Sequence, residues 1–280
     1  MTEYSFDLAK GVHALVEMVL VLEFQNPLFL NEDSVAAVRR SLEGELPNFE
    51  QPNALFIGIS QDGQPLGEPP PPPAIFSLTK PDSDGEPEWI VRVDGHRLMV
   101  HCLDYSRWSI SFNKAVSIIK EVLAHADGAL ALANASIKIV DAFKGVGDKE
   151  YFNSAILLDR DSGLLNASVF NSGYRWHQHT GWFEDASEGC ETLVRLNLDC
   201  AERALSDGFK EIYVVISNSF TLRGLFAGDS VQPVGFALDD DGWSRMTTEF
   251  GHYHWRNKTI LQSILQNKVI EKIHVFSGEE

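Results

Sequence analysis

Apolar and polar residues alternate along residues 16–24, VEMVLVLEF, and a period of two residues predicts a β-strand. The side chains expected on its buried face are Met18, Leu20, Leu22 and Phe24. The pattern over residues 31–47 is helical, and Asn31 or Asp33 can cap its amino terminus. The amino-terminal part therefore predicts a strand followed by a helix.

A turn signal at Asp94-Gly95 separates two extended segments, 88–93 and 97–103, which we expect to pair as an antiparallel hairpin. The next elements expected from the same patterns are an amphipathic helix over 113–126, a strand over 135–143 and a hairpin around 160–163. Strands and helices thus alternate in groups rather than one by one, which indicates an antiparallel sheet.

The hairpin around 160–163 is followed by residues 174–185, YRWHQHTGWFED, which predict a strand and turn at the centre of the second half. A long closing helix follows an acidic cap at Asp239–Gly242, where negative charge complements the helix dipole. Its expected inward stripe consists of Met246, Phe250, Tyr253, Asn257, Leu261 and Ile264.

These elements predict an α+β fold of two antiparallel sheet-and-helix lobes, residues 1–147 and 148–280, with a long carboxyl-terminal helix. Each half carries several strands and ends in or near an amphipathic helix, so a distant duplication is expected, with its seam near residues 145–150. Within the first lobe, residues 61–74 contain the tract Pro69–Pro73, which we interpret as a stiff loop rather than a recognition motif. A strand is expected just before it, over 54–60.

Charge narrows the range of partners. The 280-residue chain carries a formal net charge of −17, and such a field repels phosphate backbones, so nucleic-acid binding is disfavoured. It favours a protein partner, and a basic one in particular.

The cysteines and the amino terminus indicate the cellular compartment of the protein. Cys102, Cys190 and Cys200 are odd in number and form no C-x-x-C, which indicates small buried side chains in a reducing environment. The amino terminus lacks the features of a signal peptide, and no apolar run is long enough to cross a bilayer. We therefore expect a cytoplasmic protein.

Candidate metal chemistry centres on His177 and His179. Residues two apart on a strand project from the same face, which can bring two imidazoles to one divalent transition metal. A site needs further ligands, and the candidates are His254 in the closing helix and the acidic residues Glu184 and Asp185.

The alternative interpretation is structural. Trp176 and Trp182 flank the two histidines as large apolar anchors, so the segment can serve as an interface or core edge that includes Glu184. A His-x-His pair alone is a weak metal motif, and no hydrolase elbow, P-loop or dinucleotide fingerprint is present. The carboxylates of Asp159 and Asp161 fit a turn. We favour the structural or partner-binding role and expect no cofactor.

Five segments carry a resemblance to a known family: VLVLEFQNPLF, SRWSISF entering a helix, ASIKIVDAF, WHQHTGWFED and TTEFGHYHWRNKTILQSIL. Their order resembles an uncharacterised, sporadically distributed bacterial family, often encoded beside mobile-element, toxin–antitoxin or phage-defence genes. The tract Pro69–Pro73 and the carboxyl terminus depart from that pattern. The resemblance implies an accessory, antitoxin-like or sensor subunit that binds another protein.

Two functional hypotheses follow. The first is a non-catalytic, self-associating interaction module of a defence-type system, for which catalytic residues are not expected. The second is a metal-dependent hydrolase that uses His177 and His179.

Overall fold

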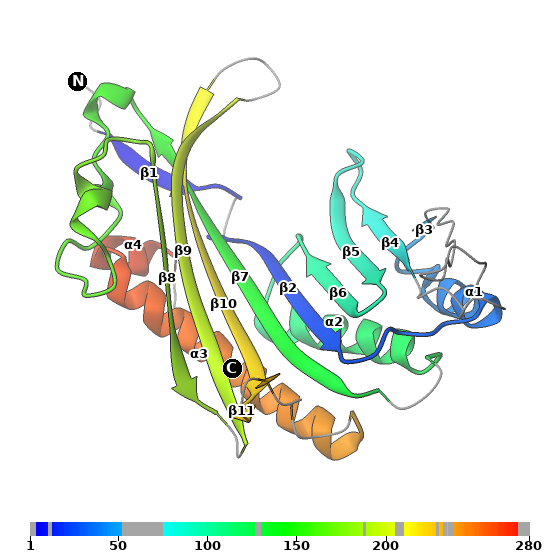
Figure 1. Ribbon diagram of the computed structural model, residues 1–280. Coiled ribbons are helices and arrows are strands. Elements are labelled where there is room, and N and C mark those ends of the chain that lie inside the picture. The colour runs from blue at the N-terminus through cyan, green and yellow to red at the C-terminus, as the bar shows by residue number, and fades with distance from the viewer. Residues whose placement is uncertain are drawn as a thin grey trace, which may run out of the picture.

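The computed structural model describes residues 4–10, 13–51, 75–126, 130–186, 189–204, 210–227, 230–231, 234 and 238–273 (Figure 1). The strands of the large sheet and of a small hairpin are β1 Ser5–Leu8, β2 Leu15–Phe24, β3 Asn48–Glu50, β4 Ile75–Pro81, β5 Pro87–Asp94, β6 Arg97–Cys102, β7 Leu132–Val146, β8 Trp176–Asp185, β9 Cys190–Ala204, β10 Lys210–Gly224, β11 Phe226–Ala227 and β12 Ser230–Val231. The helices are α1 Glu32–Leu42, α2 Trp108–Leu123, α3 Asp240–Ile264, α4 Asn267–Lys272 and the short 3₁₀ helices η1 Lys149–Tyr151, η2 Ser154–Ile156 and η3 Ala167–Phe170.

Ten of the described strands form one antiparallel sheet. Neighbours follow the order β3-β4-β5-β6-β2-β7-β10-β9-β8, and β1 pairs with the end of β7. The expected α+β class, with an antiparallel sheet and the long carboxyl-terminal helix α3, is confirmed. The sheet is continuous from the first half of the chain to the second, because β7 pairs with both β2 and β10.

The strand order has a regular plan around the central pair β2 and β7. In the first half β2 pairs with β6, the last strand of the meander β3 to β6, and α2 follows. In the second half β7 pairs with β10, the last strand of the meander β8 to β10, and α3 follows. Both meanders therefore lead back to a first strand at the centre of the sheet.

Helices α2 and α3 lie against one face of this sheet, called here the covered face (Figure 1). One row of cross-strand neighbours on the covered face is completely buried and consists of Val194, Phe220, Ile137, Leu20, Val100, Val91 and Leu78. Strict alternation along the strands puts these side chains beneath the helices and their sequence neighbours on the opposite side.

The opposite side is called here the open face. A row across it consists of Gly181, Arg195, Ser219, Lys138, Val19 and His101. Polar and charged side chains dominate this row, as expected for an antiparallel sheet with one face packed on a core.

The helix predictions agree with the structure in most respects. Asn31 caps α1 by accepting a hydrogen bond from the Ser34 backbone N–H at 2.8 Å, and Asp239 caps α3 in the same way. All six residues of the expected α3 stripe are buried. Helix α2 begins earlier than expected, at Trp108, because Trp108 and Phe112 stack at 4.7 Å and form its contact with α3.

The strand predictions agree for β2, for the β5–β6 hairpin at Gly95 and for β7, which is longer than expected. The hairpin expected around residues 160–163 is wrong. The turn exists, since Asp159 accepts a hydrogen bond from the Asp161 N–H, but the flanking segments form η2 and η3. Leu158 bridges to Leu265 beside α3, so this segment packs on the closing helix instead of on itself.

Three further predictions concern the cysteines, membrane-spanning helices and residues 54–74. Cys102, Cys190 and Cys200 are buried free thiols, as predicted. Within the described part of the chain no helix is both long and apolar enough to cross a membrane. The expected strand 54–60 and the polyproline loop 61–74 lie outside the described residues.

Candidate functional site

The segment singled out in the sequence forms strand β8, at one end of the sheet (Figure 1). It is extended through Thr180-Gly181, so the turn expected within it is absent, and it lies at the sheet edge rather than at the centre. No turn forms because ten consecutive residues of β8 pair with β9 without interruption.

Alternation along β8 separates the candidate residues into two groups. His177 and His179 are exposed on the open face, with ring centroids 5.5 Å apart. Opposite them on β9 lie Asp199 and Asn197. The side chains at 176, 182 and 184, two tryptophans and a glutamate, point to the covered face instead.

Glu184 connects β8 to helix α3. Its carboxylate accepts hydrogen bonds from the Trp182 indole N–H at 2.7 Å and from Arg256 Nε at 3.1 Å. Burial alone would raise the pKa of Glu184, but the hydrogen bonds from Arg256 and Trp182 outweigh it and keep the pKa below the usual range. Trp176 and Trp182 pack against the core, as the anchor interpretation expects.

His254 lies on the covered side of the sheet, away from His177 and His179. Its ring stacks on Trp108 of α2 at a centroid distance of 4.2 Å. Burial, with a smaller contribution from Lys258, lowers the pKa of His254 to about 4. The structure therefore does not bring His254 together with the two β8 histidines. No group of three His, Cys, Asp or Glu side chains placed to hold a metal occurs among the described residues.

Three pairs of charged or ionisable side chains lie on the open face. His101 contacts Glu17 at 2.8 Å, Arg223 contacts Glu191 at 2.7 Å, and Arg97 lies 3.5 Å from Asp94. The hydrogen bond from His101 is the main cause that lowers the pKa of Glu17. Part of the charge on this face is therefore balanced locally.

Phe183 on β8 has the most exposed large apolar side chain among the described sheet strands. Phe183 is 55% exposed, with the Arg223 guanidinium 4.6 Å from its ring centroid. At the centre of the sheet Val19 and Val140 on this face are short and buried, 5% and 7% exposed. Phe183, His177 and His179 thus project from the same side of one strand, next to solvent.

A buried polar cluster lies on the covered face beneath α3. Asn218 donates a hydrogen bond from Nδ2 to Oδ1 of Asn257 at 2.7 Å, and Asn257 also hydrogen-bonds Asp141. Burial raises the pKa of Asp141 to about 7, because the loss of solvent outweighs the hydrogen bond with Asn257. Asp141 is only 3% exposed, so it cannot meet a substrate in this arrangement.

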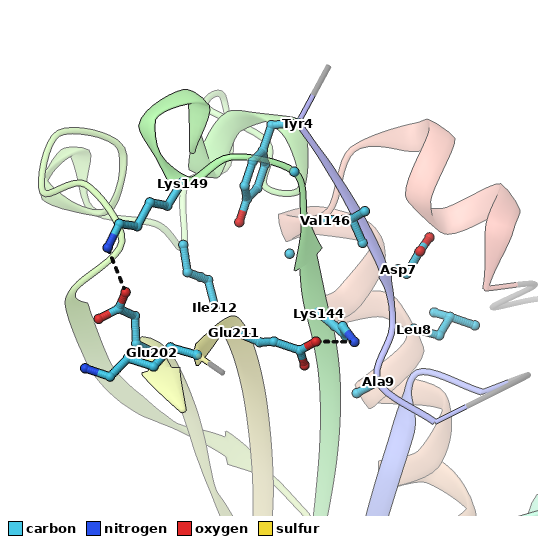
Figure 2. A pocket seen from close by; sticks show the side chains of 13 residues that line it. Tyr4, Asp7, Leu8, Ala9, Lys144, Val146, Lys149, Glu202, Glu211 and Ile212 are labelled. Carbon is cyan, nitrogen blue, oxygen red and sulfur yellow. Dashed lines mark hydrogen bonds and ion pairs between the residues drawn. The ribbon is translucent and has the colours of Figure 1, made fainter. Parts of the chain in front are cut away.

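A pocket of about 580 Å³ opens where β1, β7, β9 and β10 meet (Figure 2). Four of its charged side chains form two pairs: Lys144 with Glu211 at 2.5 Å and Lys149 with Glu202 at 3.4 Å. The phenol of Tyr4 covers Gly145, where a Cβ atom would lie 2.0 Å from the Tyr4 oxygen. The lining offers donors and acceptors for a small polar molecule, but its described residues show no nucleophile with an adjacent base.

Sequence reasoning missed both the buried cluster and the pocket. A signal for Asp141 existed, because it falls in phase with Ala135, Ile137 and Ile139 on the inward side of a predicted strand. The pocket had no local signal, since its residues come from three separate parts of the sequence, within 4–9, 144–149 and 202–212.

Comparisons with known proteins do not assign the chain to a family. No family model matches the chain, and no curated protein matches it.

Proposed function

We propose that the chain is a non-catalytic protein-interaction module that binds a protein partner through the open face at β8 and β9. The observation that carries this proposal is the exposure of Phe183, His177 and His179 together on the face opposite α2 and α3. An aromatic ring surrounded by polar groups is typical of the centre of a protein-binding site.

The charge distribution bears on the kind of partner. Some open-face ions pair locally, as Glu191 does with Arg223, so contacts beside them depend on shape, apolar area and hydrogen bonds. The overall charge of −17 acts at longer range and favours encounter with a basic protein. We therefore propose a basic protein partner, attracted by the whole molecule and bound at β8.

The family resemblance gives this proposal a biological setting. It supports an accessory, antitoxin-like or sensor subunit of a bacterial defence-type system that acts in the cytoplasm. An acidic chain that covers a basic effector is consistent with that role.

The same proposal includes a distant duplication of the two halves. The shared plan supports it, since each half has a first strand, a meander that returns beside that strand and a helix on the covered face. The repeat boundary would then lie between α2 and β7, before the boundary at 147/148 expected from sequence. The metal-dependent hydrolase stays an untested prediction that no observation at His177 and His179 favours.

A matched pair of variants tests the binding face. Phe183→Asp and Trp255→Asp replace aromatic residues of equal exposure, 55% and 53%, on β8 and on helix α3. Affinity purification from the native host after nuclease treatment should recover one discrete protein with the wild type and with Trp255→Asp. Phe183→Asp should lose it, because a charge in the centre of an interface costs about 2 kcal/mol or more.

The opposite pattern, a partner retained by Phe183→Asp and lost by Trp255→Asp, would place binding on the helix side and contradict the proposal. Stoichiometric zinc, iron or manganese in protein purified without a nickel column, with metal-dependent turnover lost in a His177→Ala, His179→Ala variant, would favour the hydrolase instead.

A further inference from the structure

Strand β8 is a long sheet edge whose outer backbone groups have no partner within the described chain. It pairs only with β9, and none of the backbone hydrogen bonds outside the sheet ladders involves residues 176–185. Unpaired N–H and C=O groups along an edge are a template for another strand. The edge at the other end, β3, is only three residues long.

Natural sheets protect long edges with proline, lysine, bulges or inward charges. Strand β8 contains no proline or lysine, and its ladder with β9 has no register shift, unlike the ladders of β2 with β7 and of β4 with β5. Its one charged side chain on the covered face, Glu184, is neutralised by Arg256. The edge is therefore open to pairing.

The sequence of β8 is complementary to itself in the antiparallel sense. Histidine occurs near its beginning and acidic residues at its end, so two copies that run in opposite directions bring His179 of each beside Asp185 of the other. Both side chains are exposed on the open face, where an imidazole N–H can donate to the carboxylate.

One register also fits the glycine of this strand. A twofold axis at Trp182 places Phe183 of one copy opposite Gly181 of the other, on the same open face. Gly181 cannot carry a side chain easily, because a Cβ would lie 3.0 Å from the Val194 carbonyl oxygen. An aromatic ring laid over an edge glycine covers its exposed backbone.

We propose that two copies of this chain associate through antiparallel pairing of residues 179–185 of β8, which joins their sheets and open faces into one surface. Two His179–Asp185 contacts and two Phe183–Gly181 contacts fix the register. The inference does not rest on the proposed protein partner, because the purified chain alone is enough for the association.

Sedimentation equilibrium of the purified chain tests the dimer. The wild type should be a dimer, and His179→Asp or Asp185→Lys should each raise the dissociation constant about tenfold or more, since each change occurs twice. The double variant with both changes should restore the dimer, because each contact between the two positions then joins opposite charges again. His177→Asp, exposed on the same face but outside the paired segment, is the matched control and should leave the dimer unchanged.

The inference is overturned by a monomer at about 100 μM, by a dimer that neither single change weakens, or by a double variant that does not restore the dimer. A monomer whose edge pairs with a strand of another protein also overturns it and assigns the edge to that partner. Loss of the dimer with retention of the protein partner leaves the proposed function intact, so the two proposals fail separately.

Discussion

Asp141 and His254 on the covered face of the sheet differ from Glu17 on the open face in what controls their pKa values. On the covered face, burial dominates at Asp141 and His254, and their pKa values shift towards the neutral form, to about 7 and about 4. On the open face, Glu17 sits beside His101 and its pKa falls, which favours the charged form. Desolvation thus dominates at Asp141 and His254, whereas at Glu17 the hydrogen bond from His101 outweighs it.

This difference shows where function and where stability reside. Charges that stay ionised near solvent are available to a partner, whereas neutral buried groups only affect folding. The comparison predicts that covered-face changes alter stability strongly and open-face changes alter association.

The largest effect is expected from a matched pair of phenylalanines. Phe220→Ala should lower the free energy of unfolding by about 3–5 kcal/mol, because Phe220 is completely buried and stacks on Tyr253 at 5.3 Å. Phe183→Ala should cost less than about 1 kcal/mol, since that ring is exposed and loses chiefly its contact with Arg223. Denaturant unfolding of both variants measures the difference, and similar losses would refute the assignment of the two faces.

Asp141 should give the protein a stability that falls as pH rises. Its pKa is about 7 in the folded protein and 3.8 as the reference value, so the folded state holds a proton that the unfolded state releases between these pH values. The stability contributed by protonated Asp141 is complete below pH 3.8 and is lost by about pH 7. The loss is on the order of 4 kcal/mol. Asp141→Asn keeps the shape and removes this dependence, so it should stabilise the protein at about pH 8 and hardly change it near pH 4.

The control for this prediction is Asp199→Asn, the same replacement at an exposed open-face position. It should change the unfolding free energy by less than about 0.5 kcal/mol at either pH. A destabilised Asp141→Asn variant at high pH would mean that the carboxylate is ionised and supported inside the core.

Much of the fold could be predicted from the sequence because hydrophobic periodicity records which side of an element is buried. The six-residue stripe of α3 and the alternating face of β2 both follow from that rule. The hairpin expected around residues 160–163 failed because a turn signal fixes a reversal but not what the flanking segments pack against.

The candidate site was harder to predict, for a physical reason. Sequence identified His177 and His179 and placed them on one face, but it could not show that β8 is an edge, because edge or centre depends on strand order. It also could not place His254 on the other side of the sheet, since that needs the packing of α3 on α2. Strand order and helix packing are set by contacts between distant residues, which local patterns do not encode.

The smallest of the three stability effects is expected from histidines on the two sides of the sheet. The folded protein disfavours a proton on His254 that the unfolded chain accepts, because the pKa is lowered from 6.5 to about 4. The stability that neutral His254 contributes is complete above pH 6.5 and is lost as the pH falls towards 4. The loss is at most about 3 kcal/mol.

Asp141 acts in the opposite direction over part of this pH range, so the measurement is made with the Asp141→Asn variant as the starting protein. There, His254→Phe keeps a ring against Trp108 and should abolish the loss of unfolding free energy between about pH 7 and pH 4.5, whereas His177→Phe should leave it unchanged. If both variants keep the acid-induced loss, another group causes it and the burial of His254 between the helices does not control its protonation.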